Sequence, residues 1–393
     1  MPNFYNYTQN GLVYSFDDVF VPADAFREGN LFTWGRNLYG NLGDNARTDA
    51  RSTPVTTFAG GTNWKQVSSG NNHCAAIKTD GTLWTWGINS SGQLGDNTRT
   101  ARCTPVTTFA GGTNWKQVSA GSNHCAAIKT DGTLWTWGNN GYGRLGNNII
   151  TIRSIPVTTF AGGTNWKQVG AGTNHCAAIK TDGTLWTWGI NSSGELGDNT
   201  TTTRSTPVTT FAGGTNWKQV SGGYGHCAAI KTDGTLWTWG RAVDGRLGDN
   251  TTTNKRTPVT TFAGGTNWKQ VSAGSFHCAA IKTDGTLWTW GSGADGRLGT
   301  NDTTTNKLTP VTTFAGGTNW KQVGTGGNNH CAAIKTDGTL WTWGNNGYGK
   351  LGDNTIISRS TPVTTFAGGT NWKQVGAGSN QCAAVTFIDY VIE

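Results

Sequence analysis

The chain has 393 residues, of which 59 are glycine, 20 are tryptophan and only 13% are charged. The regular apolar runs exclude a disordered, solvating chain, and none of them is long enough to span a membrane as a helix. The formal net charge of +8 permits an acidic partner, but the absence of a basic block or basic helix argues against nucleic acid.

Residues 1–30 form a leader that shares no pattern with the rest of the chain. The leader lacks the basic start and apolar core of a signal peptide, so we expect synthesis in a cytoplasm. It is unusually apolar for a free end, which predicts a docking arm that binds another subunit. The predicted arm residues are Phe4, Tyr5, Tyr7, Phe16, Val19, Phe20 and Val21.

The hexapeptide TNWKQV occurs seven times, at steps of 51 or 52 residues, so one supersecondary unit is repeated. One unit predicts strands at 116–119, 124–129, 134–137 and 157–160, with an Asp-Gly hairpin turn before the third. Four-stranded units repeated radially make a β-propeller. We therefore predict an all-β, seven-bladed β-propeller over residues 31–387.

The two ends of the repeat region complement each other. Residues 31–34 read as a third strand with no first or second strand before it, and residues 381–385 read as a second strand with no third strand after it. One blade is thus expected to be shared between the N- and C-termini, which closes the ring and removes its open edge. A short apolar tail, residues 388–393, follows.

Three residue types, tryptophan, histidine and cysteine, recur at equivalent positions of the units and invite functional interpretations. The tryptophans could sense light or stack on sugars, and the histidines could bind metal or catalyse, but equal recurrence favours scaffold roles. Equivalent cysteines at a radius of about 10 Å would lie roughly 9 Å apart, beyond the reach of a disulfide. We expect buried, free cysteines, with Cys103 as the exception outside the repeat pattern, and neither a metal site nor a cofactor. The histidines precede the repeat cysteines, with Gln381 in the seventh place.

The repeat resembles that of the regulator of chromosome condensation family. The match covers residues 31–387 and is carried in one unit by Val118, Gly121, His124, Asp131, Gly132, Trp137, Gly138, Gly143, Leu145 and Gly146. The resemblance implies a seven-bladed propeller closed by both termini. It does not fix a function, because this family includes an exchange factor, a photoreceptor and an enzyme inhibitor.

A second resemblance concerns the leader. The stretch YSFDDVFVPADAF, which runs into LFTWGRNLYGNLGDN, together with the near-identical repeats, is similar to repeat proteins encoded by tailed phages of marine cyanobacteria. This resemblance implies a virion component that is made in the host cytoplasm and contacts other virion proteins through residues 1–30.

Only two segments vary between units, namely the turn between the first and second strands and the long loop between the third and fourth. In an up-and-down blade both segments emerge on the same face, and loops on a rigid scaffold carry binding residues. Drift in loops remains the alternative. The predicted partner-binding residues of this face are Tyr39, Tyr142, Arg144, Tyr224, Arg241, Arg246, Phe276, Arg297 and Tyr348.

No catalytic constellation, phosphate-binding loop or zinc-binding motif stands in a unique setting, so we predict a non-enzymatic protein. The interpretation that explains most features is a virion propeller, anchored by its leader, whose variable loops face outward for attachment. A host-surface protein or glycan would be the ligand, without membrane insertion. The alternative is a soluble protein- or glycan-binding propeller that is not part of a virion.

Overall fold

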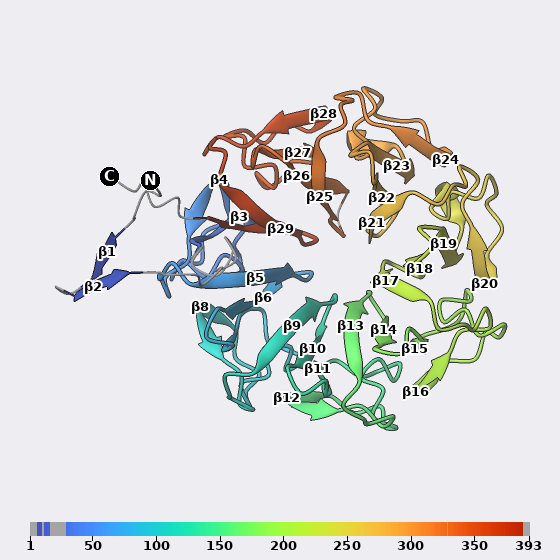
Figure 1. Cartoon of the computed structure of the whole chain (residues 1–393), viewed down its shortest axis with the longest axis horizontal. Helices are drawn as coiled ribbons and strands as arrows, with labels where there is room; N and C mark the ends of the chain where they lie inside the picture. The colour runs from blue at the N-terminus through green and yellow to red at the C-terminus, as the bar shows by residue number, and fades with distance from the viewer. Residues whose placement is uncertain (1–5, 10–11, 16–28, 328, 388–393) are drawn as a thin grey trace.

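A computed structural model describes residues 6–9, 12–15, 29–327 and 329–387 of the chain. Seven four-stranded antiparallel sheets are arranged as blades around a central opening (Figure 1). The predicted seven-bladed, all-β propeller is therefore confirmed. The separate strands β1 (Asn6–Gln9) and β2 (Leu12–Ser15) form a hairpin in which Tyr7 pairs with Tyr14. The other predicted arm residues lie outside the described part of the chain.

Each blade runs from an innermost strand at the opening to an outermost strand at the rim. The innermost strands are β5 (Trp64–Ser69), β9 (Trp115–Ala120), β13 (Trp166–Ala171), β17 (Trp217–Gly222), β21 (Trp268–Ala273), β25 (Trp320–Thr325) and β29 (Trp372–Ala377). The second strands are β6 (His73–Lys78), β10 (His124–Lys129), β14 (His175–Lys180), β18 (His226–Lys231), β22 (His277–Lys282), β26 (His330–Lys335) and β30 (Gln381–Thr386).

The third strands are β3 (Leu31–Arg36), β7 (Leu83–Gly87), β11 (Leu134–Gly138), β15 (Leu185–Gly189), β19 (Leu236–Gly240), β23 (Leu287–Gly291) and β27 (Leu340–Gly344). The outermost strands are β4 (Ala50–Thr56), β8 (Arg102–Thr107), β12 (Arg153–Thr158), β16 (Arg204–Thr209), β20 (Lys255–Thr260), β24 (Lys307–Thr312) and β28 (Arg359–Thr364).

The outermost strand differs from its prediction at both ends. It spans Arg153–Thr158 instead of 157–160, and Pro156 lies inside it, where a register shift against β11 accommodates the missing N–H. Phe160 follows the strand, in a turn closed by the bond from Gly162 N–H to the Thr159 carbonyl. Its ring is 65% exposed. The apolar pattern of Val-Thr-Thr-Phe was therefore misleading, because Phe160 points away from the blade.

The shared blade is the sheet β29-β30-β3-β4, in which Trp34 pairs with Cys382, so the predicted ring closure is confirmed. In this blade the second strand β30 and the third strand β3 come from opposite ends of the repeat region, so they pair without the hairpin turn that joins them in the other blades. Gly29 accepts a hydrogen bond from Trp64 N–H at 3.1 Å, just as Gly81 of the hairpin in another blade accepts one from Trp115 N–H at 3.0 Å. The shared blade thus keeps the glycine–tryptophan hydrogen bond that the hairpins of the other six blades make.

The apolar core lies between blades. One cluster joins Ala75, Ile77 and Leu83 of one blade to Trp115 and Trp137 of the next, and equivalent clusters lie at the other interfaces. The tryptophan that precedes the glycine of each third strand is fully buried, and its indole N–H donates to a carbonyl of the preceding blade. The scaffold interpretation of these tryptophans is confirmed.

Polar side chains add two further rings of contacts between blades. In all seven interfaces a glutamine of the innermost strand donates to, and accepts from, the backbone of a valine in the next blade, at 2.8–3.4 Å. Six buried histidines contact the cysteine of the next blade at 3.0–3.2 Å. Gln381 contacts Cys74 at 3.7 Å in the seventh interface. These histidines are therefore structural core groups, as predicted.

The cysteines also match the prediction. All eight are free thiols, and the seven of the repeats are buried while Cys103 is half-buried. Burial raises the pKa of Cys74 to about 11, which makes this thiol a poor nucleophile.

Candidate functional site: the variable face

The two faces of the propeller are built from different connections. The backbone N–H of Asn139, in a long loop, donates to the carbonyl of Asn123, in a short turn, so both variable segments share one face, as predicted. The hairpin residue Thr130 donates to Asn114 of the connection between blades, which puts both constant segments on the opposite face. We call these the variable face and the constant face.

An asparagine organises the long loop in five of the seven blades. Asn140, for example, accepts from Leu145 N–H at 3.0 Å and donates to the Ile149 carbonyl at 2.8 Å, which fixes the loop from inside. The organising residues are Asn37, Asn89, Asn140, Asn191 and Asn346. The two remaining blades have Ala242 and Gly293 at this position.

Those two blades form a different loop. Short 3₁₀ turns, η1 (Val243–Gly245) and η2 (Ala294–Gly296), replace the asparagine-centred structure. Asp244 and Asp295 adopt positive φ values of 64° and 59° within them. We call these two loops, 241–254 and 292–306, with the adjacent turn residues Tyr224 and Phe276, the exceptional sector.

The exceptional sector brings together five of the nine predicted binding residues. Tyr224 and Phe276 lie with ring centroids 5.9 Å apart. The Phe276 ring lies 5.1 Å from the Arg246 guanidinium and 5.6 Å from that of Arg297. Arg241 lies 5.9 Å from the Tyr224 ring. The result is a cluster of two aromatic rings and three guanidinium groups across neighbouring blades.

Burial divides these residues into two roles. Arg246 is 1% exposed and donates to the carbonyls of Val243, Tyr224 and Ser275 at 2.8, 3.2 and 2.9 Å. Arg297 is also buried and donates to the Ala294 carbonyl at 2.7 Å. These guanidinium groups hold the loops and rings in place, whereas Tyr224, which is 38% exposed, faces solvent.

The other predicted residues lie on separate blades. Arg144 is buried beneath Tyr142, which is 46% exposed, and the guanidinium lies 5.4 Å from the ring. Tyr348 lies 4.9 Å from the guanidinium of Arg36. Tyr39 is half-buried on a further blade. These tyrosines are individual contacts on the variable face and not parts of one cluster.

Sequence reasoning missed three participants. Asp244 and Asp295 pair with the buried Arg246 and Arg297 at 3.3 and 3.4 Å, and Arg36 supports Tyr348. The signal for the two aspartates is present in the sequence, because both loops that contain them lack the organising asparagine. No comparable signal marks Arg36.

One buried position of the long loop is chemically variable although its backbone role is constant. Its carbonyl accepts the tryptophan N–H of the next blade, whereas its side chain changes from blade to blade. Burial raises the pKa of Glu195 and lowers the pKa of Lys350 to about 8. The residues at this position are Asn41, Gln93, Arg144, Glu195, Arg246, Arg297 and Lys350.

The described residues contain no group of three or more histidine, cysteine or acidic side chains that could hold a metal ion. In the same part of the chain, no helix has the length and apolar character needed to cross a membrane. What the variable face offers chemically is a pre-formed surface of aromatic rings and cations.

Known proteins share this architecture. The profile of the RCC1-like domain matches residues 25–329, and that of the regulator of chromosome condensation (RCC1) repeat matches residues 337–385. The crystal structure of human WBSCR16 superposes with a TM-score of 0.79 at 22% identity, covering 92% of this chain and 99% of that one. Yeast RCC1 (Prp20), crystallised with Kap60 bound to it, superposes with a TM-score of 0.80 at 18% identity, covering 92% of this chain and 89% of that one.

Curated relatives are longer than this chain. The ultraviolet-B receptor UVR8 of Arabidopsis thaliana is 31% identical over 68% of this chain and 62% of its own length. The E3 ubiquitin-protein ligase HERC2 of Mus musculus is 26% identical over 91% of this chain but only 8% of its own length. The chain thus spans less than two thirds of the receptor and a small part of the ligase. With the profile match over most of its length, the chain belongs to the RCC1-like domain family.

Proposed function

We propose that the chain is a non-enzymatic interaction propeller that recognises a partner through the exceptional sector of its variable face. Its relatives include a receptor, ligases that contain this domain, and a yeast protein crystallised with a bound partner. Binding to other macromolecules is the activity that such propellers have in common, while their chemistry differs.

The observation that carries this proposal is the burial of Arg246 and Arg297 beneath the Tyr224–Phe276 pair. Two guanidinium groups that are almost removed from solvent hold aromatic rings in fixed positions at a surface. Rings fixed before binding lose little conformational entropy on contact, and Tyr and Arg are the common anchors of protein interfaces. In the described part of the chain, the five asparagine-centred loops hold no pair of rings like Tyr224 and Phe276, although Arg144 lies beneath the single ring of Tyr142.

We further propose that the propeller is a virion component whose leader, residues 1–30, binds other virion proteins and leaves the variable face outward for host attachment. The support is the similarity of the leader to phage-encoded repeat proteins and the position of the leader's end. Gly29 is hydrogen-bonded to Trp64 on the constant face, opposite the exceptional sector.

Deleting residues 2–28 tests the proposed anchoring. The deletion stops before Gly29, whose carbonyl holds Trp64, so the propeller should melt at the same temperature as the full chain. We expect the truncated chain to be absent from gradient-purified particles. The Y224A variant is the matched control and should be incorporated normally. Incorporation of the truncated chain at the full-length level would refute the anchoring role.

A glycan ligand is the second candidate, and one observation favours it. Tyr142 and Tyr348 are 46% and 40% exposed, so two aromatic rings on this face are available for stacking on sugars. Saturable binding to a glycan array that is lost in a variant with both Y142A and Y348A would favour this alternative over a protein ligand.

A further inference from the structure

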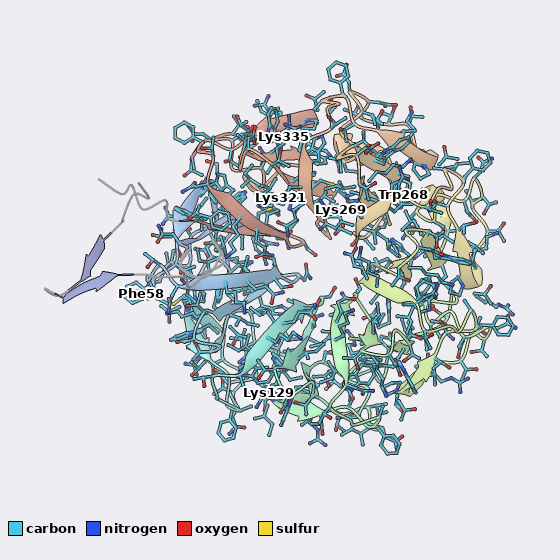
Figure 2. The ribbon with its side chains drawn as sticks, viewed as in Figure 1. Phe58, Lys129, Trp268, Lys269, Lys321 and Lys335 are labelled. Atoms are coloured by element: carbon cyan, nitrogen blue, oxygen red, sulfur yellow. The ribbon has the colours of Figure 1, made fainter. Side chains whose placement is uncertain are left out.

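Seven lysines encircle the central channel on the constant face. Each is the second residue of an innermost strand, and Figure 2 shows Lys269 and Lys321 closer to the channel than Lys129 and Lys335. Six are exposed, and Lys373 is half-buried. We call Lys65, Lys116, Lys167, Lys218, Lys269, Lys321 and Lys373 the lysine ring.

A second set of lysines lies farther out and is compensated locally. Lys78, for example, lies 4.8 Å from the rings of both Trp64 and Trp84, and Asp80 follows in the same hairpin. The same lysine, two tryptophans and aspartate recur in five more blades. Each outer lysine therefore has a carboxylate partner nearby in sequence, and the positive charge of this face comes from the lysine ring.

Among the described residues, no negative charge on the channel side balances the lysine ring. The channel has a volume of about 310 Å³, and it is lined by glutamine, serine, threonine, valine, alanine and glycine residues together with Asn71 and Tyr224. None of its described lining residues is charged. Lys65 and Lys269 likewise form no ion pair within the described part of the chain. Like charges arranged around one opening reinforce each other's potential and attract an anionic partner.

The structure also shows what kind of group the lysine ring accepts. Phe387 lies with its ring 5.7 Å from Lys321 Nζ and 5.0 Å from Lys373 Nζ. An aromatic side chain of a polypeptide is thus held between two members of the ring by cation–π attraction. Among the described residues, the other five members of the lysine ring have no aromatic side chain over them. A polypeptide is therefore better supported as an occupant than a polyphosphate, which has no aromatic group.

We propose that the lysine ring is a docking site for an acidic polypeptide segment that carries aromatic residues. Carboxylates of the segment pair with the ammonium groups, and its aromatic rings stack on them as Phe387 does. The proposal gives the chemistry of a constant-face partner and holds whether or not the assembly is a virion.

The test uses the full-length chain and a labelled synthetic peptide with the sequence of residues 14–26, YSFDDVFVPADAF. This peptide has three aspartates and four aromatic residues. The variant K65Q/K167Q/K218Q/K269Q removes four ring lysines away from Phe387. Because exposed ion pairs are individually weak, we expect about tenfold weaker peptide binding at low salt and a shallower salt dependence. The matched variant K78Q/K180Q/K231Q/K282Q removes four outer lysines and should bind within about twofold of the unsubstituted chain.

Two further probes separate this proposal from its alternatives. The same peptide with asparagine at its three aspartate positions should lose binding, and one with leucine at its aromatic positions should bind more weakly. Equal binding of the asparagine peptide, or an unchanged affinity of the ring variant with a native melting temperature, would overturn the proposal. So would tighter binding of inositol hexakisphosphate or single-stranded DNA than of the peptide, since the ring would then be a general phosphate site.

Discussion

Acidification from pH 6.5 to pH 4 is expected to unfold this propeller steeply, because its buried histidines must take up protons together. Burial lowers the pKa of His73 and His175 to about 4 and that of His226 to about 3. Burial also lowers the pKa of His124 and His277 well below the usual value, and nearby Arg144 and Arg297 lower these further.

The sign of the effect follows from where the protons bind. The unfolded chain protonates these histidines near pH 6.5 and the folded chain only near pH 4 or below, so stability is complete above pH 6.5 and falls as the pH decreases. Each histidine contributes about 1.4 kcal/mol per pH unit, so five together approach 7 kcal/mol per unit. The loss begins well above the range in which aspartates titrate.

Urea denaturation followed by tryptophan fluorescence at pH 7, 6 and 5 measures this slope. The chain supplies its own control, since Gln381 occupies the histidine position in the seventh interface and donates to the Gly70 and His73 carbonyls. The H226Q variant should therefore fold and should reduce the slope by about one proton. A free energy of unfolding that stays constant between pH 6.5 and 5 would contradict the structural role assigned to the buried histidines at the blade interfaces.

The R246A variant is expected to show the second-largest effect, a loss of about 3 kcal/mol in the free energy of unfolding. The substitution leaves three loop carbonyls without their donor and Asp244 without its ion pair. It also removes the support beneath Phe276, so the exceptional sector should lose its fixed shape. Urea denaturation at pH 7 gives the stability.

Two variants separate the guanidinium's contacts from its charge. R246K keeps the charge but cannot reach all the carbonyls, and we expect it to recover less than half of the loss. R256A removes an exposed arginine from the strand β20, which follows the same loop, and should change the stability by less than about 0.5 kcal/mol. If R246A were as stable as R256A, Arg246 would not organise this sector.

The repeat made most of the fold predictable. Seven equal spacings and the split shared blade were enough to give the propeller, its closure and the scaffold roles of tryptophan, cysteine and histidine. The end of the outermost strand was wrong because the apolar Phe160 continues a strand-like pattern but lies in an exposed turn. The local pattern could not show that, because the backbone N–H of Phe160 is held by the Gly146 carbonyl of the long loop, a contact that the apolar pattern does not reveal.

The candidate site was less predictable than the fold. Arginines in variable loops read as surface residues, yet Arg144, Arg246 and Arg297 are buried between blades. Each of them stands at the position whose backbone carbonyl accepts the tryptophan N–H of the next blade, while its side chain varies between blades. That burial depends on a contact across a blade interface, which the sequence does not show. The hydrogen bonds between the glutamines and valines of neighbouring innermost strands were not predicted either, because the partners are about fifty residues apart in the sequence and meet only across a blade interface.

The most direct test of the account exchanges one loop of the exceptional sector for an ordinary loop of the same chain. Residues 241–254 are replaced by the sequence of residues 190–203, which has equal length and restores the organising asparagine; the control makes the same replacement at residues 88–101. The measurement is saturable binding of the labelled full-length chain to host cells. We expect the first exchange to abolish binding and the control to preserve it, with both proteins folded. Undiminished binding after the first exchange would contradict recognition by the exceptional sector.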